Sequence, residues 1–286
     1  ETFGTASIIV CNHQSMLDSA VFMALSPKTI LVSNSKVSRN RVIRKIYQWN
    51  GFITLDDKSA INDELVRDYI AHGYSLVVFP EGKRNDRSTI SRFHKGAFLF
   101  AERYGLDIQP FIIHGLNVVL PRNSFQVFTG SIMVKGYERV RQDGHTTYSE
   151  MTSRVHAFYK KEYERLAREI ETAAYFAPLV EDRYCYKGVE IYRSVHKNIK
   201  RNNCFTRWID TSESFSAVLI KNNDHGEFAL LYALVHPSTL VTVLEEDESK
   251  RALLTYCAKG IADNLQVTDH VDMKEAEEAG IKIISL

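Results

Sequence analysis

A histidine and an aspartate near the start of the chain, His13 and Asp18, have the residue types and spacing of a general-base pair. They follow the apolar run IIVC at residues 8–11, which predicts a buried strand. A helix that begins near Ser15 would leave His13 in the connecting loop and Asp18 in the first helical turns. The carboxylate could then fix the tautomer of the ring and leave its other nitrogen as a proton acceptor. The competing interpretation is a histidine that caps a helix and an aspartate in its favourable first turn.

A second stretch, SLVVFPEGKRNDRSTISRFHKGAF at residues 75–98, brings several cations together. Glu81 and Gly82 directly follow a strand-like run, and Pro80 ends that run. Gly82 permits a tight turn close to a ligand, and Lys and Arg side chains on such a loop would bind phosphate or carboxylate. The alternative is a solvated basic loop. The candidate residues that follow the turn are Lys83, Arg84, Lys95 and the adjoining Gly96.

The elements that must position these residues alternate between strand and helix over roughly the first 140 residues. This alternation predicts an α/β sheet covered by helices, with the site on loops at the strand ends. Gly73 and Gly105 are placed to end two of the helices. The expected strands are 7–11, 29–33, 76–79, 108–114 and 132–134, and the expected helices are 61–70 and 97–104.

The rest of the chain predicts a smaller α/β unit after the first. A long helix at 149–176 and another at 188–200 are expected before the strand and helix alternation restarts. We therefore predict two domains, residues 1–180 and 181–286, and we expect the smaller one to be truncated. Its expected strands are 216–220, 240–244, 265–268 and 282–286, with helices at 227–235 and 248–259.

Four motifs in order make the first domain resemble the lysophospholipid and glycerol-phosphate acyltransferase family. The resemblance covers roughly residues 5–140 and implies the fold of that family, a mixed sheet flanked by helices. Lys83 and Asn85 depart from the Thr and Ser of the family's second motif. In chain order the matching residues are Asn12, His13, Ser15 and Asp18, then FPEGKRN at 79–85, FHKG at 93–96 and IQPFIIHG at 108–115.

The resemblance implies acyl transfer from acyl-CoA or acyl-carrier protein, without a covalent enzyme intermediate. His13 would take the proton from a hydroxyl of a lysophospholipid, a glycerol-phosphate or a related lipid, and Asp18 would orient His13. A thioester is already activated, so positioning and one base suffice. Neither a metal nor a cofactor is implied. The residues implied for substrate binding are Asn12, Ser15, Glu81, Gly82, Lys83, Arg84, Lys95 and Gly96.

One departure from the family bears on the acceptor. The family has an arginine for the acceptor phosphate between the first two motifs, whereas this chain has Asp56 and Asp57 there, with Lys58 as the nearest cation. Two carboxylates would repel a phosphate dianion. The acceptor therefore stays open among glycerol 3-phosphate, its monoacyl form, an amino-acid-containing lipid and another alcohol or amine.

Composition and charge limit the partners and the compartment. A net charge of +1 does not favour nucleic acid. The four cysteines contain no C-x-x-C pair, which argues against a zinc or disulfide framework and fits a reducing compartment. No apolar run approaches the ~18 residues that span a bilayer. The basic and apolar segment at 35–51 could lie on an anionic membrane or dock an acidic carrier protein, or else pack as an ordinary helix on the sheet.

The pattern from residue 215 onward resembles the opening of a class I S-adenosylmethionine-dependent methyltransferase, a Rossmann-like fold. Glu245 and Gly226 match that family's acid and last glycine, whereas Ile220, Asn222 and Asp224 replace its Asp and first two glycines. Side chains there would obstruct the cofactor, so we do not expect S-adenosylmethionine to bind. We interpret the unit as degenerate, serving structure or docking.

The two resemblances together are similar to a bacterial arrangement in which an exporter, an acyltransferase and a methyltransferase are fused. Because the chain begins at Glu1 without a methionine, we expect a piece of a longer polypeptide, possible fusion to an upstream exporter, and a place at the cytoplasmic face of the membrane. Two alternative functions stay open. One is a non-catalytic module that binds lipid or acyl carrier, and the other is a methyltransferase.

Overall fold

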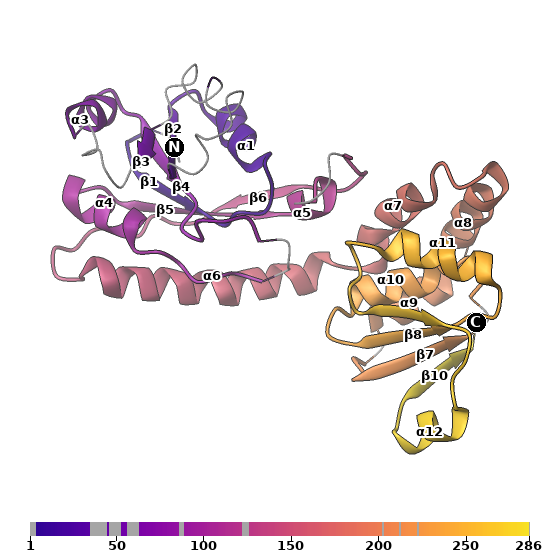
Figure 1. Cartoon of the computed structure of the whole chain (residues 1–286). Helices are drawn as coiled ribbons and strands as arrows, with labels where there is room; N and C mark the ends of the chain where they lie inside the picture. The colour runs from indigo at the N-terminus through magenta and orange to yellow at the C-terminus, as the bar shows by residue number, and fades with distance from the viewer. Residues whose placement is uncertain are drawn as a thin grey trace. The chain divides into compact units, whose positions relative to one another are not determined.

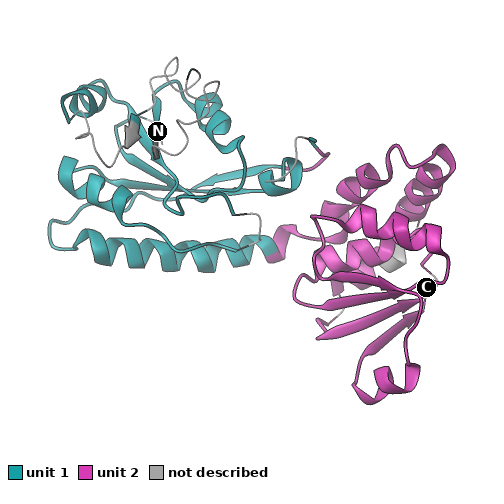
Figure 2. Ribbon diagram, in the orientation of Figure 1, with its two compact units in different colours: residues 1–127, 132–167 teal, residues 128–131, 168–286 magenta. Residues whose placement is uncertain are grey.

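The computed structural model describes residues 4–34, 45, 53–55, 63–85, 89–121, 126–201, 203–211, 213–221 and 223–285. The chain forms two compact units, coloured separately in Figure 2. The first contains residues 1–127 and 132–167, and the second contains residues 128–131 and 168–286. The predicted boundary between residues 180 and 181 falls inside α7 (Ala173–Tyr184). That helix packs against α10 (Glu227–Val235) and so belongs to the second unit.

The first unit is built on a six-stranded mixed sheet with the strand order β3-β2-β4-β1-β5-β6. All neighbouring strands are parallel except β5 and β6, which are antiparallel. The expected α/β fold, a mixed sheet flanked by helices, is confirmed. The strands are β1 (Ile8–Cys11), β2 (Thr29–Asn34), β3 (Ile53–Leu55), β4 (Ser75–Val78), β5 (Ile108–His114) and β6 (Met133–Gly136).

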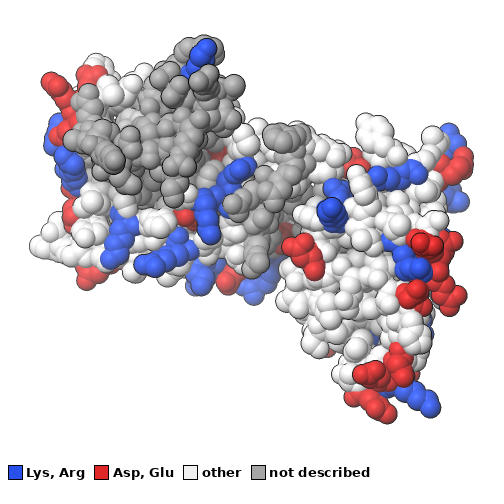
Figure 3. All heavy atoms as spheres, in the orientation of Figure 1, with Lys and Arg blue, Asp and Glu red and all other residues white. Residues whose placement is uncertain are grey.

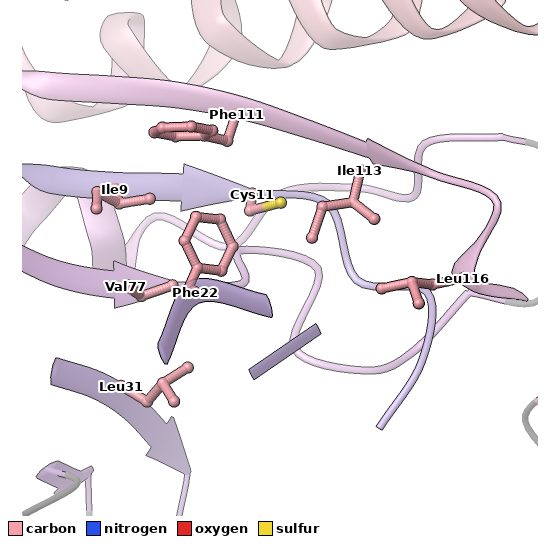
Figure 4. Packing of buried hydrophobic residues seen from close by; sticks show 8 residues of the cluster. All are labelled: Ile9, Cys11, Phe22, Leu31, Val77, Phe111, Ile113 and Leu116. Carbon is pink, nitrogen blue, oxygen red and sulfur yellow. The ribbon is translucent and has the colours of Figure 1, made fainter. Parts of the chain in front are cut away.

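Helices cover both faces of this sheet, with α1 on one side and α6 along the other (Figure 1). Phe22 of α1 packs among the central strands in a core that includes Ile9, Cys11 and Val77 (Figure 4). Every residue of β1 is buried, as expected for a central strand of a largely parallel sheet. The helices are α1 (Asp18–Leu25), α3 (Asp63–Ala71), α4 (Gly96–Tyr104), α5 (Leu116–Val119) and α6 (Tyr148–Ile170).

The prediction of one long helix at 149–176 was wrong in length, because the structure has two helices there. α6 ends at Ile170, and α7 starts a new helix at Ala173. Thr172 has an extended backbone, and its hydroxyl accepts a hydrogen bond from the Tyr175 amide at 3.2 Å. Such an N-cap stabilises the start of a helix, so the chain turns at this point instead of continuing.

The second unit contains a four-stranded parallel sheet with the order β10-β7-β8-β9. Its strands are β7 (Ala217–Lys221), β8 (Leu240–Leu244), β9 (Leu265–Thr268) and β10 (Lys282–Ser285). Besides α7 and α10, its helices are α8 (Val189–Arg201), α9 (Asn203–Thr211), α11 (Glu248–Ala258) and α12 (Met273–Glu278). In the part of the chain that the structure describes, no helix has the length and apolar character needed to cross a membrane.

Candidate active site

The central strand β1 carries His13 to the edge of the sheet where β4 also ends. The two strands are parallel neighbours, so the loops that follow them meet at one edge. The backbone amide of His13 donates to Oε1 of Glu81 at 3.0 Å. The carbonyl of His13 accepts from the Asn85 amide at 2.7 Å. The two stretches that the sequence singled out therefore form one site.

The His13 ring is bonded to the Asp18 carboxylate, with 2.6 Å between Nδ1 and Oδ2. The same Oδ2 accepts from the backbone amides of Gln14 at 2.7 Å and Ser15 at 2.9 Å. The Asp18 side chain is 0% exposed, whereas the His13 side chain is 22% exposed. With Asp18 ionised, Nδ1 carries the proton and Nε2 is left as the basic nitrogen.

The other oxygen of Asp18, Oδ1, has no hydrogen-bond partner within the described chain and faces buried surroundings. Cys11 lies close enough for this carboxylate to act on its thiol. Burial, reinforced by Asp18, raises the pKa of Cys11 well above its usual value, so the thiol stays protonated. The Cys11 thiol therefore adds no charge to the site, and the Asp18 carboxyl group lies where it can stabilise a protonated His13 ring.

Phe79 holds the face of the His13 ring. The two rings are stacked with centroids 4.5 Å apart and planes 21° from parallel. Phe79 itself packs against the core below α1 and lies edge-on to Phe22, at 6.3 Å. The imidazole is therefore held in plane by Asp18 and across its face by Phe79.

The Glu81 side chain links the loop after β1 to the loop after β4 and does not project into solvent. Its side chain is buried, and its two oxygens accept from the backbone amides of His13 and Ser91, at 3.0 and 2.9 Å. Burial raises the pKa of Glu81, although the two backbone hydrogen bonds oppose that rise. The sequence predicted that Glu81 lines the site of the acceptor substrate. In the structure, both of its carboxylate oxygens accept hydrogen bonds from backbone amides.

The turn after Glu81 requires glycine and exposes two cations. Gly82 has φ +67°, and a Cβ atom there would meet the His94 ring at 3.1 Å. Lys83 is exposed and Arg84 is half-buried. Neither side chain is paired with an acidic group in the described chain. These two cations follow directly on the Gly82 turn, in the loop whose Asn85 amide bonds to the His13 carbonyl.

Asn12 and Ser15, also expected at the substrate, are both buried and bonded within the protein. The Asn12 amide exchanges two hydrogen bonds with the backbone of Ile113, each 2.8 Å, and so extends the β1–β5 pairing by one residue. The Ser15 hydroxyl donates to the Leu120 carbonyl at 3.0 Å. These two side chains therefore stabilise the backbone on either side of His13.

Lys95 and Gly96 lie where the loop after β4 enters α4. The Lys95 ammonium donates to the Ser149 hydroxyl at 2.9 Å, at the start of α6. Gly96 is exposed, and a Cβ atom there would meet nothing within 4 Å. The structure thus gives Lys95 a contact to α6, and no close approach makes glycine necessary at position 96.

Sequence reasoning missed Gln14, which ties the site to α6. Its amide donates to the Tyr163 hydroxyl at 2.7 Å, and its carbonyl accepts from the Leu116 amide at 3.2 Å. Its position between two motif residues gave a weak signal, but its partner lies 149 residues further along the chain. Pairing across such a distance leaves no local pattern.

The departure at Asp56, Asp57 and Lys58 and most of the basic segment at 35–51 lie outside the described residues. Across the described ranges, no group of three or more His, Cys, Asp or Glu side chains is arranged to hold a metal ion.

Residues 3–114 match the protein family described as Acyltransferase. A 1-acyl-sn-glycerol-3-phosphate acyltransferase from Cocos nucifera is 26% identical over 167 residues, 56% of this chain and 54% of that protein. One from Helicobacter pylori is 28% identical over 170 residues, 56% of this chain and 71% of that protein. The chain spans about half the length of the first of these relatives.

A crystal structure of the 1-acyl-sn-glycerophosphate (LPA) acyltransferase PlsC from Thermotoga maritima superposes with a TM-score of 0.49 and 21% identity. The superposition covers 57% of this chain and 66% of that chain. The family description and the names of these relatives agree on an acyltransferase.

Proposed function

We propose that this chain transfers a fatty acyl group from a thioester donor, acyl-CoA or acyl-carrier protein, to a hydroxyl of a lysophospholipid or a related lipid. The observation that carries the proposal is the His13–Asp18 pair, with its basic nitrogen unbonded within the described chain and the Lys83–Arg84 turn tied to the same loop. The relatives named above are acyltransferases for 1-acyl-sn-glycerol 3-phosphate, which supports this substrate class.

The chemistry needs one proton to move out and back. Nε2 of His13 takes the proton from the acceptor hydroxyl as its oxygen forms a bond to the thioester carbonyl carbon. Asp18 stabilises the charged imidazolium through Nδ1. When the carbon–sulfur bond breaks, the imidazolium returns the proton to the leaving thiolate, which departs as free thiol. The new ester and the neutral histidine remain.

The choice of acceptor follows from the cations that flank the histidine loop. Lys83 and Arg84 are suited to an anionic headgroup, Arg84 through its forked donors. The sequence has Asp56 and Asp57 where the family has its phosphate-binding arginine, which weighs against a phosphate monoester. We therefore propose a lipid alcohol whose anionic group carries less charge than a phosphate dianion.

Substitution of His13 tests the function. His13→Ala should lower the rate of thiol release from acyl-CoA or acyl-carrier protein, with a lysophospholipid present, by roughly 10²- to 10⁴-fold, because the base is lost. Circular dichroism should show an unchanged fold. His72→Ala is the matched control, since His72 also contacts an aspartate, Asp68 at 3.3 Å, but lies exposed directly after α3. Turnover that survives His13→Ala would rule the mechanism out.

A non-catalytic module that binds lipid or acyl carrier is the alternative, motivated by the absent phosphate-binding arginine. It predicts binding of lysophospholipid or acyl-carrier protein by calorimetry, without thiol release by the wild-type chain. Any thiol release above that of His13→Ala excludes it.

The second unit is Rossmann-like in our proposal, because its parallel strands follow the order of half a doubly wound sheet. In such a fold a cofactor lies at the start of the helix after the first strand, here α10. Glu227 is fully buried at that point and accepts from the Asn198 amide at 2.7 Å and the His225 backbone at 3.2 Å. A Cβ atom on Gly226 would meet Leu254 at 2.5 Å. These contacts argue against S-adenosylmethionine there, and calorimetry that shows its binding would revive the methyltransferase alternative.

A further inference from the structure

The turn between α7 and α8 carries an aromatic side chain that projects into solvent. Tyr186 is 97% exposed and has φ +67°, a left-handed conformation that is uncommon for a bulky residue. Two residues earlier, Tyr184 is fully buried, and its hydroxyl donates to the His225 carbonyl at 2.7 Å. Tyr184 thus anchors the start of the turn in the core. The Tyr186 ring projects outward from a strained, left-handed backbone.

Two more large side chains near this turn are exposed. Val189, the first residue of α8, is 64% exposed, and Tyr256 of α11 is 58% exposed. The Lys187 ammonium lies 3.4 Å from the centroid of the Tyr256 ring, which places a cation against this aromatic side chain. A small group of apolar tips with a positive charge among them therefore marks this end of the second unit.

The outer face of α8 continues that surface with cations. Val189 is followed at helical spacing by Arg193, Lys197 and Lys200, while Val195 and Ile199 point into the unit and are buried. Arg201 is also exposed on the outer side. Acidic groups lie here too: Glu190 is 3.6 Å from Arg193 with both groups largely exposed, and Glu181 of α7 bonds to the His196 ring of α8 at 2.7 Å. In Figure 3, Lys and Arg side chains lie over α7 and α8 with an acidic group among them at the upper right, and a larger acidic cluster lies near α11.

We propose that this α7–α8 surface, formed by Tyr186, Lys187, Val189, Arg193 and Lys197, binds an anionic phospholipid bilayer. Tyrosine rings prefer the headgroup level of a membrane, and nearby Lys and Arg side chains are attracted to anionic lipid. A few projecting tips suit a headgroup layer better than a protein partner, which needs an interface of about 600 Å² or more per side. The inference rests on the proposed function, because a lipid acceptor and its product reside in a membrane.

Vesicle binding tests the inference without turnover. The full chain carrying His13→Ala should sediment with vesicles of equal parts phosphatidylcholine and phosphatidylglycerol, and far less with phosphatidylcholine alone or at high salt. Adding Arg193→Glu and Lys197→Glu should weaken binding roughly tenfold or more. The charge-matched control is Lys274→Glu with Lys282→Glu, on α12 and β10, where both lysines are exposed. This control should bind like the parent.

Tyr186 offers a variant that removes the ring without harming the fold. Tyr186→Gly relieves the left-handed backbone, so thermal stability should not fall, yet vesicle binding should drop several-fold. Tyr186→Trp should keep it. Thiol release by these variants in the wild-type background, with a water-soluble acceptor, should be unchanged, so a loss of catalysis would count against the proposed function instead.

Three outcomes overturn the inference. They are no binding of the parent to anionic vesicles, equal weakening by the charge-matched control, and binding that survives both Tyr186→Gly and the charge reversal. A fourth would reassign the surface: charge reversal that weakens binding of acyl-carrier protein and leaves vesicle binding intact.

Discussion

The two nitrogens of the His13 ring have different surroundings. Nδ1 is bonded to a fully buried carboxylate, whereas no described residue bonds to Nε2 on the partly exposed side of the ring. Stacking on Phe79 restricts rotation of the ring out of this arrangement. In the proposed reaction, a base held in this way would lose little motion on accepting a proton, because its orientation is set before substrate binds.

Asp18→Asn should therefore damage turnover more than binding. The neutral amide no longer stabilises the imidazolium, so kcat should fall roughly 10²- to 10⁴-fold, with KM nearly unchanged. Steady-state kinetics of thiol release measures both constants. Asp68→Asn, at the exposed His72 pair, should leave both unchanged. If Asp18→Asn raised KM alone, Asp18 would be acting in substrate binding and not through His13.

Glu81 should leave a signature in the pH dependence of stability. Its pKa is raised by burial above the ordinary 4.5, so the folded state holds this proton more tightly than the unfolded state. Its contribution to stability is complete below about pH 4.5 and is lost as pH rises through the higher folded pKa. The difference in unfolding free energy between wild type and Glu81→Gln should decline over that interval in urea titrations.

Glu150 supplies a control of opposite sign for the same titrations. Hydrogen bonds from Thr147 lower its pKa below 4.5, so its contribution is present above that pH and is lost as pH falls through the folded pKa. The difference between wild type and Glu150→Gln should thus decline toward low pH. Parallel curves for the two variants would contradict the assignment for Glu81.

Sequence patterns at the residue scale predicted which residues come together better than they predicted what each contacts. His13 and Asp18 were expected to be paired, and the structure pairs them. Glu81, Asn12 and Ser15 were expected at the substrate, whereas their polar atoms bond to the protein backbone. A motif shows which residue type occurs at a position. It does not show whether that side chain binds a ligand or bonds to a backbone amide of a loop.

At the scale of elements, one buried hydroxyl of α6 bonds to two strands of the sheet. Tyr159 donates to the Val10 carbonyl at 2.6 Å and the Phe111 carbonyl at 3.0 Å, and it accepts from the Phe111 amide at 3.0 Å. It thus bonds to β1 and β5 just before β1 ends and the His13 loop begins. Burial raises the pKa of Tyr159 well above its usual value, so it remains a neutral donor.

Tyr159→Phe should destabilise the chain by about 1–3 kcal/mol, because three buried backbone contacts lose their partner. Urea unfolding followed by tryptophan fluorescence and circular dichroism measures this change. Tyr256→Phe, at an exposed ring, should cost less than about 0.5 kcal/mol. Equal effects of the two substitutions would show that the Tyr159 hydroxyl bonds contribute little net stability.

Long apolar runs and glycine stops predicted the strands of both sheets to within a residue or two, because buried parallel strands are continuous in hydrophobicity. Four short or amphipathic elements of the described residues were missed: β3, α5, α9 and α12. β3 has three residues and α12 has six, too few for a period to show. The break between α6 and α7 depends on one threonine cap, which a pattern of apolar residues does not reveal.

At the scale of the molecule, each unit has its own buried core, so each is expected to unfold cooperatively by itself. Leu230→Ala, at a fully buried site of α10, should lower the stability of the second unit by about 2–5 kcal/mol. Ile112→Ala, fully buried in β5, should lower that of the first unit by a similar amount. Scanning calorimetry should show each variant shifting a different transition.

A single transition shifted by both variants would contradict this independence. Thiol release offers a further check, since Leu230→Ala should leave it unchanged at temperatures where the second unit remains folded. Loss of turnover in Leu230→Ala under those conditions would mean that the second unit contributes to catalysis.

The tie between His13 and Glu81 spans 68 residues of chain, and it has a consequence for the order of folding. During synthesis the histidine loop is made well before β4, so for that interval its amide and carbonyl lack their partners from the later loop. Parallel pairing of distant strands is slow compared with helix formation. The onset of turnover during refolding should thus coincide with pairing of β1 and β4. The time at which activity appears would then report when these two strands pair.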